Sequence, residues 1–357
     1  MISGWKIRRE LARFGQQLRG IGEKLTDPAK QRKLNRVVAA GLPQFDGALP
    51  LTTKVALFLV YQPKGISPST LETCRTLSNA GYTPLIVSNC PLSANDQELL
   101  RPFIWRAVER PNFGYDFGGY RDGLICLKKW DVAPEELLIL NDSIWFPVLP
   151  DADLWDRLAQ ETSDIAGTIL RERGAERFLE SYLFRIRRPA LEHPAFAAYW
   201  ADLQLTSNKY HVIRRGERGF SAAMRAGGIG VAGVYDDKAL PERVAKQDDD
   251  FLRQTLRFAA YIDTGLAEQS AQLLADGGQD WRAAVLAHIH KVMEKRQGYS
   301  SFPYANMCLT GYPILKKSGE PVSKAWRLAY LNALNANAIT APSQEILQEI
   351  KARDTQR

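Results

Sequence analysis

The chain has 357 residues, of which 45% are hydrophobic and 24% charged, with a formal net charge of +7. These values are typical of a globular protein of one to three domains, and they exclude a largely disordered chain. The longest apolar runs, such as residues 55–61, are far shorter than the ~18 residues that a membrane-spanning helix needs. The first ten residues lack the apolar region of a signal peptide, and four scattered cysteines fit a reducing compartment. The expected location is therefore the cytoplasm.

The positive charge is concentrated at the N-terminus. Residues 1–40 contain ten lysines and arginines against three acidic residues, which accounts for the whole net charge. Apolar residues recur there at spacings of three and four, at Ile7, Leu11, Phe14, Leu18, Ile21 and Leu25. This spacing predicts a basic amphipathic helix.

Such a helix favours binding of residues 1–40 to the inner face of the cytoplasmic membrane, peripherally. Docking on the protein's own body, a two-helix contact or a coiled-coil dimer fits the pattern as well. No nucleic-acid partner is expected, because nucleic-acid binders usually carry their basic residues on the folded body.

After residues 39–51, which are rich in glycine and proline and predict a linker, short apolar runs alternate with helical patterns. Strands are expected at 54–61, 83–89, 103–110, 135–142, 164–170 and 180–188, and helices at 67–82, 120–130 and 151–161. This alternation indicates an α/β fold with a doubly wound, mainly parallel sheet. Beyond residue 188 the pattern is mainly helical.

Ligands of such sheets bind beyond the carboxyl ends of the strands, which directs attention to Asn89, to the segment 112–123 and to Asn141. The segment 112–123 (NFGYDFGGYRDG) holds four glycines, four aromatic residues and two aspartates. We expect a loop whose glycines let a ligand approach the backbone, while Asp116 and Asp122 bind its polar groups. A tight turn that caps the next helix is the alternative.

Asp142 follows an apolar strand in LILNDSIWFP, residues 138–147. A carboxylate in this position suits a divalent cation on a diphosphate, whereas an Asx turn is the structural alternative. A literal D-x-D sequence at Asp151 and Asp153 opens a predicted helix, where aspartate is better explained as a cap.

Five stretches occur in the order that is typical of one protein family. They are RPNFGYDFGGYRDGL (110–124), LLILNDSIWFP (137–147), ESYLFRIRRPALEHPAFAAYW (180–200), YHVIRRGERGFSAAMRAGG (210–228) and ANMCLTGYPILKKS (305–318). Over residues 54–318 the chain resembles the rhamnan synthesis protein F family, glycosyltransferase-like proteins of bacterial surface polysaccharide assembly. The resemblance implies a GT-A-like fold with a helical C-terminal part. The expected parts are the arm and linker (1–48), the GT-A-like catalytic domain (49–270) and a mainly helical region (271–357).

The resemblance implies a glycosyltransferase that moves a sugar, such as rhamnose or another deoxyhexose, from a nucleotide-sugar donor to a lipid-linked or polysaccharide acceptor. A non-catalytic glycan-binding or assembly subunit with the same fold is the alternative. The expected donor-binding residues are Asn89, Asn112, Gly114, Tyr115, Asp116, Gly118, Gly119, Asp122, Asn141, Arg214 and Arg215.

The usual metal motif of such transferases offers two carboxylates for Mg²⁺ or Mn²⁺, whereas Asn141-Asp142-Ser143 offers only Asp142, which leaves metal dependence open. Glu217 is the leading candidate for the general base that deprotonates the acceptor hydroxyl. Asp116 is its rival, with Glu180 and Asp248 as weaker alternatives. Arginine forks match phosphate oxygens, so Arg214 and Arg215 are expected to clamp the diphosphate.

Overall fold

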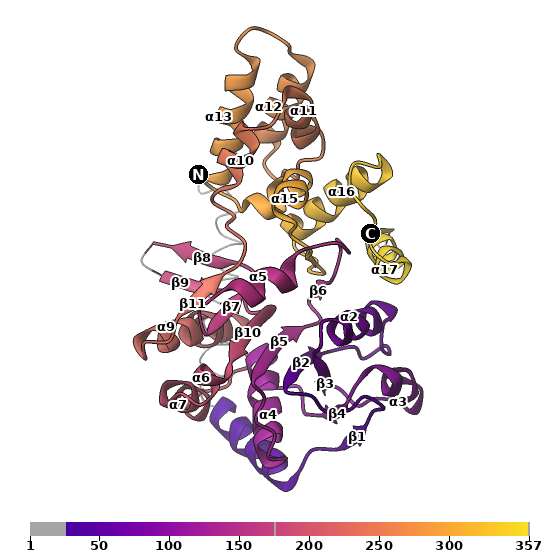
Figure 1. Cartoon of the computed structure of the whole chain (residues 1–357), viewed down its shortest axis with the longest axis vertical. Coiled ribbons are helices and arrows are strands. Elements are labelled where there is room, and N and C mark those ends of the chain that lie inside the picture. The colour runs from indigo at the N-terminus through magenta and orange to yellow at the C-terminus, as the bar shows by residue number, and fades with distance from the viewer. Residues whose placement is uncertain (1–25, 175, 356–357) are drawn as a thin grey trace, which may run out of the picture.

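The computed structural model describes residues 26–174 and 176–355. Within these ranges an α/β body is followed by a helical C-terminal region, which lies at the opposite end of the molecule from residues 26–40 (Figure 1). The amphipathic stripe expected between residues 7 and 25 lies outside the described residues. No helix in the described ranges is long and apolar enough to cross a membrane.

The centre of the described body is an eight-stranded sheet with the strand order β1-β4-β3-β2-β5-β10-β7-β11. Its strands are β1 (Gln44–Asp46), β2 (Lys54–Val60), β3 (Thr83–Ser88), β4 (Arg106–Glu109), β5 (Glu136–Asn141), β7 (Ile165–Gly167), β10 (Leu183–Arg187) and β11 (Val231–Gly233). Strands β4, β3, β2 and β5 are parallel, as are β7 and β11, whereas β10 runs antiparallel to both neighbours and β1 antiparallel to β4. The expected α/β class with a mainly parallel sheet is confirmed.

The sequence of β2 explains why both faces of the sheet are covered. Val55, Leu57 and Leu59 belong to one hydrophobic core cluster, and the alternating Ala56 and Phe58 belong to another. Side chains alternate between the two faces of a strand, so a continuous apolar run needs packing partners on both sides.

Helices supply those partners. The body contains α2 (Pro68–Asn79), α3 (Ala94–Leu100), α4 (Tyr115–Lys129), α5 (Leu154–Gln160), α6 (Arg188–Leu191), α7 (Pro194–Asp202), α8 (Lys209–Val212), the 3₁₀ turn η1 (Arg101–Phe103), the π-helical turn η2 (Ile213–Arg218) and α9 (Gly219–Ala226). Leu77 of α2 packs on one face, and Phe117 and Leu127 of α4 pack on the other with α7 and α9. The site described below lies at the N-terminal end of α4.

The C-terminal region is helical, as expected. It comprises α10 (Leu240–Ala245), α11 (Asp249–Arg257), α12 (Thr264–Ala275), α13 (Trp281–Met293), α14 (Gly298–Ser301), α15 (Pro303–Thr310), α16 (Pro321–Asn335) and α17 (Gln344–Thr355). Helices α10 to α13 share a separate core cluster with α15 around Trp281 and Phe302. This region returns to the body through β12 (Leu315–Lys316), which pairs antiparallel with β6 (Ile144–Trp145) just after β5. The boundaries expected near residues 48 and 270 stay predictions.

Residues 26–40 are helical and lie against the body. Leu34 and Val38 are buried in the core cluster that contains α4, and the Gln31 side chain bonds the backbone of Leu203 and Leu205. The segment 39–51, expected to be a linker, contains β1 at the edge of the sheet. The expectation did not anticipate this strand, because three residues give almost no periodic signal.

A hairpin that the sequence did not predict projects from the body. Its strands are β8 (Leu170–Arg173) and β9 (Glu176–Leu179), which pair antiparallel with each other. The expected strand over 164–170 ends instead at Gly167. The sequence gives no signal for this hairpin, because residues 171–177 are mainly charged and strands are predicted from apolar and β-branched residues.

Candidate functional site

The candidate site lies at the carboxyl ends of the parallel strands. Val60 is in register with Ser88, and Leu59 with Asn141, so β2, β3 and β5 end at the same edge of the sheet. The next residues along the chain are Tyr61, Asn89 and Asp142. This placement confirms the expected edge as the location of those side chains.

Two cavities at this edge share Tyr61. The smaller has a volume of about 320 Å³ and is lined by Tyr61, Asn89, Asn112, Phe113, Gly114, Tyr115, Asp116 and Ser207. The larger, of about 580 Å³, is lined by Tyr61, Gln62, Pro63, Lys64, Gly65, Ser67, Asp142, Ser143, Lys317, Ser318, Glu349 and Arg353. The structure thus gathers five of the expected donor-binding residues around one cavity and places Asp142 in its neighbour.

The polypeptide between β4 and α4 is held by Arg110, a residue that the sequence analysis did not single out. The buried guanidinium donates to the Asp122 carboxylate at 2.7 Å, to the Phe113 carbonyl at 2.7 Å and to the Asn89 side chain. One arginine therefore fixes the start of the loop, a strand end and the helix relative to one another. A single arginine before a proline gives no recognisable sequence signal for this role.

Helix α4 begins at Tyr115, so most of the segment 112–123 is helix and not the expected loop. An added Cβ at Gly119 would meet Leu59 Cδ1 at 2.2 Å, and one at Gly118 would meet the Phe113 carbonyl oxygen at 2.3 Å. Gly118 and Gly119 therefore permit close packing, and neither lines the smaller cavity, so the geometry gives no support to the expectation that they bind donor. Gly114 differs, because it lines the smaller cavity with φ +87°, a conformation that favours glycine.

Asp122 is also structural. Its side chain is fully buried and accepts hydrogen bonds from Arg110 at 2.7 Å and from Arg121 at 2.8 Å. A carboxylate with two arginine partners and no exposed surface has no access to a ligand, so its expected role in donor binding is corrected.

Asn141 orients the residue that follows it. Its side-chain amide donates to the Tyr120 hydroxyl at 2.8 Å, and its Oδ1 accepts from the Ser143 backbone at 3.1 Å. The second bond is the Asx turn that the sequence analysis held as the structural alternative. Because Asn141 is buried and bonded in this way, it supports the site and does not reach into it.

Asp142 presents its carboxylate to the larger cavity. Oδ2 accepts from the Tyr61 backbone N–H at 2.9 Å and from the Gln62 side chain at 3.1 Å. Burial raises the pKa of this carboxyl, whereas those hydrogen bonds and the nearby charge of Lys317 oppose the rise. Lys317 comes from the closing motif at residues 305–318, so the C-terminal region contributes to the site.

Asp116 and Glu217, the two expected catalytic residues, are brought near each other and near Asp142. Burial raises the pKa of Asp116 to about 7, with further contributions from the negative charges of Asp142 and Glu217. Burial and the charge of Glu180 raise the pKa of Glu217. Glu217 lies in η2, and its Oε2 accepts from the Ser181 hydroxyl at 3.0 Å. Single π-helical turns occur frequently at functional sites.

The weaker candidates have structural partners. Glu180 is buried and bonded to Lys316 at 2.8 Å and to the Tyr299 hydroxyl at 2.7 Å. Asp248 caps α11 by accepting from the Phe251 N–H at 2.8 Å. Asp153 is the residue before α5, but its carboxylate pairs with Arg157 and does not accept a cap hydrogen bond.

Arg214 and Arg215 do not line either cavity at the strand ends. Arg214 lines a separate pocket beside β9, and Arg215 donates to the Gln204 carbonyl at 3.3 Å. The expected clamp on the donor diphosphate therefore has no support from the geometry. Arginine side chains are long, and their positions in a motif do not reveal which face of a helix carries them.

The carboxylates of the site meet only part of what Mg²⁺ or Mn²⁺ requires. Among the described residues, no group of three or more histidine, cysteine, aspartate or glutamate side chains could hold a metal ion. Asp142 still has an oxygen, Oδ1, to which no described residue donates a hydrogen bond. One carboxylate fits the way Mg²⁺ is usually bound, through one or two carboxylates, water and substrate phosphates.

A mainly parallel sheet with carboxylates beyond the carboxyl ends of its strands defines an α/β ligand-binding protein of the doubly wound class. Within this class, the sequence profile of the family described as "Rhamnan synthesis protein F" matches residues 85–256. The resemblance to this glycosyltransferase-like family, inferred above from five motifs, is confirmed over that range.

The chain is 33% identical over 249 residues to the uncharacterized protein y4gN of Sinorhizobium fredii (strain NBRC 101917 / NGR234). The match covers 69% of this chain and 64% of the relative, so it spans less than two thirds of that protein.

Two solved structures have a loosely similar arrangement. The mannosyltransferase PcManGT from Pyrobaculum calidifontis, in complex with GDP-Man and Mn²⁺, is 11% identical with a TM-score of 0.31, covering 90% of this chain and 97% of that chain. The glycosyltransferase GlyE of Streptococcus pneumoniae TIGR4 is 12% identical with a TM-score of 0.35, covering 82% of this chain and 66% of that chain. Similarity at this level indicates nothing about substrate or metal.

Proposed function

We propose that the protein is a glycosyltransferase of polysaccharide synthesis with a GT-A-like fold. It transfers a sugar, rhamnose or another deoxyhexose, from a nucleotide-sugar donor to a lipid-linked or polysaccharide acceptor. The observation that carries the proposal is the convergence of Asp116, Asp142 and Glu217, three partly buried carboxylates from separate segments, at the edge where such sheets bind ligands. The family match over residues 85–256 supports it.

In this proposal the donor occupies the two cavities that share Tyr61. Tyr61 and Tyr115 expose 51% and 43% of their surfaces, although large aromatic side chains are usually buried. Both residues line the smaller cavity, and in this proposal their rings stack on a base or sugar. Asp116 and Asn112 provide the polar contacts there.

The negative charge of the site requires a positive partner before an anionic diphosphate binds. Asp142 would hold Mg²⁺ or Mn²⁺ together with the donor phosphates, and the cation supplies charge stabilisation for the departing diphosphate. Lys317, whose charge acts on Asp142, contributes on the side of the C-terminal region.

Glu217 is the proposed general base. Ser181 holds its carboxylate through the backbone N–H at 3.3 Å and the hydroxyl at 3.0 Å, which fixes the direction of the second oxygen. A raised pKa makes this carboxylate a stronger proton acceptor, and a base with a pKa near the working pH is the most effective. Asp116, with a pKa of about 7, is the alternative base.

The inner face of the cytoplasmic membrane is the proposed partner of residues 1–40. The described end of this arm is anchored beside the smaller cavity, because Asp27 accepts from the Ser207 backbone N–H and hydroxyl, both at 3.1 Å. Ser207 lines that cavity, so membrane binding by the arm would bring the site close to a lipid-linked acceptor. Flotation with anionic liposomes tests this, since loss of residues 1–25 should abolish it.

The function is tested by thermal stabilisation with a panel of nucleotide sugars, with and without Mg²⁺ or Mn²⁺, followed by transfer assays with lipid-linked acceptors. Asp116→Ala should weaken donor binding, whereas Asp151→Ala, at an exposed position outside the site, should not. Glu217→Gln should leave donor binding intact and lower kcat by about 10²- to 10⁴-fold. Absence of both stabilisation and transfer across the panel would refute the proposal.

The second candidate is a non-catalytic glycan-binding or assembly subunit. The presence of a single carboxylate at Asp142, where the usual motif has two, favours it. This candidate requires that polysaccharide stabilises the protein while nucleotides do not.

A further inference from the structure

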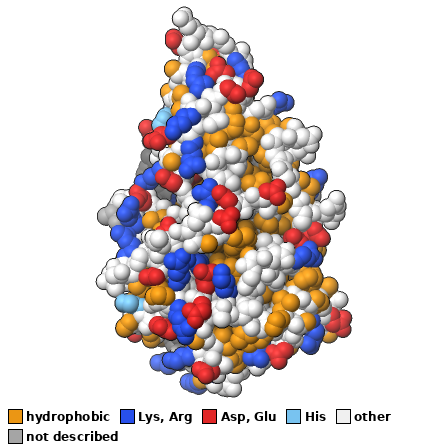
Figure 2. Space-filling model, in the orientation of Figure 1, with side chains coloured by type: hydrophobic (Ala, Val, Ile, Leu, Met, Phe, Trp, Pro, Cys, Tyr) orange, Lys and Arg blue, Asp and Glu red, His pale blue; other side chains and the backbone are white. Residues whose placement is uncertain are grey.

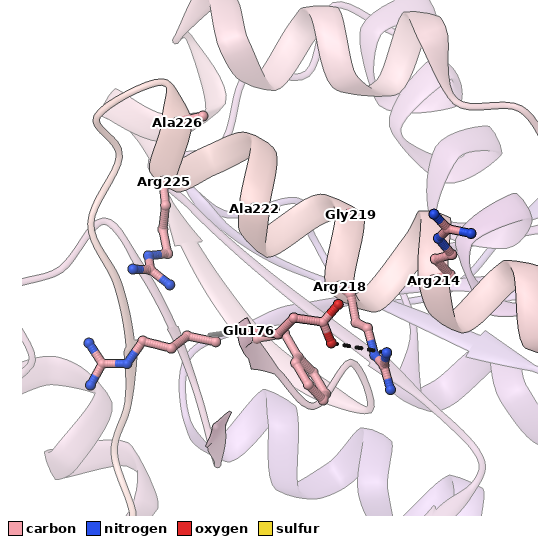
Figure 3. A pocket seen from close by; sticks show the side chains of 9 residues that line it. Glu176, Arg214, Arg218, Gly219, Ala222, Arg225 and Ala226 are labelled. Carbon is pink, nitrogen blue, oxygen red and sulfur yellow. Dashed lines mark ion pairs between the residues drawn. The ribbon is translucent and has the colours of Figure 1, made fainter. Parts of the chain in front are cut away.

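A third pocket, with a volume of about 540 Å³ and named the arginine pocket below, lies between β9 and the helical face formed by η2 and α9 (Figure 3). Its lining contains four arginines and one glutamate, together with small or apolar residues: Glu176, Arg177, Phe178, Arg214, Arg218, Gly219, Ala222, Arg225 and Ala226. Figure 2 shows lysine and arginine side chains gathered along the side of the molecule where Figure 1 places β8 and β9. The pocket is therefore strongly basic.

Only part of this positive charge is neutralised. Arg218 pairs with Glu176 at 3.0 Å, and Arg177 pairs with Glu172 of β8. Arg214 and Arg225 have no acidic partner within the described residues 26–174 and 176–355. Two arginine charges thus remain available to an anion.

The arginines are arranged in a row. Arg214, Arg218 and Arg225 follow one another along η2 and α9 at spacings of four and seven residues, and all three line the pocket. The α-helical part alone, from Arg218 to Arg225, extends over about 10 Å, so the row is longer than a single phosphate. An elongated anion, such as a diphosphate or a phosphate with a sugar attached, matches this row better than a small ion.

Arg218 is held in place before any ligand arrives. Its guanidinium lies 5.3 Å from the centre of the Phe178 ring, and its Nε is buried with no hydrogen-bond partner. A buried donor without an acceptor is costly, and arginine forks are well matched to phosphate oxygens. The ion pair with Glu176 and the contact with Phe178 therefore fix the Arg218 guanidinium at the wall of the pocket.

This pocket shares no lining residue with the two cavities at the strand ends. It is nevertheless connected to the proposed base, because Glu217 lies between Arg214 and Arg218 in η2. The same strand that lines the pocket with Phe178 leads three residues later to Ser181, which binds the Glu217 carboxylate. Glu217 and two arginines of the pocket therefore lie on the same helical turn, although Glu217 itself does not line the pocket.

We propose that the arginine pocket binds a phosphoryl group of the acceptor, and so positions an acceptor hydroxyl at Glu217. The inference rests on the proposed transferase function, which it deepens by assigning an anionic acceptor. The phosphoryl group belongs either to a lipid-linked diphosphate or to a phosphorylated glycan, which share the chemistry that arginine recognises.

The test is isothermal titration of the full chain with inorganic pyrophosphate, geranyl diphosphate and glucose 1-phosphate. The double variant Arg214→Gln/Arg225→Gln should weaken binding at least about tenfold, because two charged contacts are lost. Both side chains are exposed or partly exposed, so the fold should be retained. Glu176→Gln should tighten binding, because it removes the competing carboxylate.

Arg282→Gln serves as the matched control, since Arg282 pairs with Asp249 in the helical region and should leave binding unchanged. Preference for geranyl diphosphate or for glucose 1-phosphate identifies the lipid-linked or the glycan source. Absence of binding by the wild type, or equal binding by the double variant, would overturn the inference.

A nucleoside diphosphate is titrated in parallel to separate the two proposals. The double variant should bind it as the wild type does, whereas Asp116→Ala should weaken it. Loss of nucleotide binding in the double variant would mean that the arginines contact the donor, and would overturn the acceptor assignment. Failure of the wild type to bind any nucleotide would count against the transferase itself, whatever the result with pyrophosphate.

Discussion

The two halves of the segment 112–123 have a similar composition and opposite uses. Residues 112–116 line a cavity, and Asn112 and Tyr115 are exposed. Residues 117–123 form two buried turns of α4 against the sheet, where glycines allow close approach to Leu59 and Leu57. Glycine permits a ligand or a neighbouring element to come close to the backbone, and composition does not distinguish between them.

The two aspartates of this segment, Asp116 and Asp122, differ in the same way. The Asp116 carboxylate accepts no hydrogen bond from the described part of the chain and its pKa is raised, whereas Asp122 is fully buried between two arginines. One carboxylate is available for chemistry, and the other holds the loop in place. The predictions below test whether residues 112–116 bind a ligand while residues 117–123 stabilise the fold.

The largest effect on stability is expected from Asp122→Asn. Removing one partner of a buried ion pair leaves the other charge uncompensated, which typically costs about 3–5 kcal/mol. Arg110 would lose that partner, and the contacts it makes to Asn89 and Phe113 would loosen. Urea denaturation measures the loss in the free energy of unfolding.

Asp46→Asn is the matched control. Asp46 pairs with Arg106 at 2.6 Å, but 69% of its side chain is exposed, so its loss should cost less than about 1 kcal/mol. Equal effects of the two substitutions would show that Asp122 is not the structural anchor described here.

Gly118→Ala should have the next largest effect. The added methyl group would lie 2.3 Å from the Phe113 carbonyl oxygen, and backbone atoms cannot move aside as a side chain can. Overpacking of this kind costs about 1–3 kcal/mol, against which the higher helix propensity of alanine offsets up to about 1 kcal/mol. The measurement is the same denaturation, with Gly319→Ala as control because nothing lies within 4 Å of that position.

A Gly118→Ala variant as stable as the wild type would remove the packing explanation for the glycines. The original expectation, in which they admit a ligand, would then regain support.

The sheet could be predicted because β2, β3 and β5 are continuous apolar runs separated by helical patterns. The hairpin β8–β9 and the edge strand β1 could not, since their pairing depends on contacts between residues whose local sequence is charged or very short. The start of α4 was placed too late because Gly118 and Gly119 are poor helix formers. Tertiary packing against β2 overrides that preference.

The sequence predicted the sheet edge at which the candidate site lies better than it predicted the residues that form the site. Strand register places Asn89 and Asp142 at the same edge of the sheet, and this follows from the rule for parallel sheets. The ion pair between Arg110 and Asp122, and the separation of Arg214 from Asp116, depend on contacts between residues 12 or more positions apart. No local pattern encodes such contacts.

The last effect concerns Asp116 and has the opposite sign. The pKa of Asp116 is about 7 in the folded protein and near its ordinary value of 3.8 in the unfolded chain. Between about pH 4 and pH 7 the folded state therefore binds more protons than the unfolded state, so this group lowers stability as the pH rises. Above pH 7 both states are ionised and the cost stays constant.

Asp116→Asn removes this cost. The variant should be more stable than the wild type by about 1–3 kcal/mol at pH 8 and nearly equal to it at pH 4. Denaturation curves at several pH values measure the difference, with Asp151→Asn as an exposed control. Parallel curves for the wild type and Asp116→Asn would mean that neither burial nor the charges of Asp142 and Glu217 raise the pKa of Asp116. The proposal that the carboxylates of the donor site need a positive partner would then fail. An enzyme site that sacrifices stability for function is expected to become more stable when its unfavourable charge is removed.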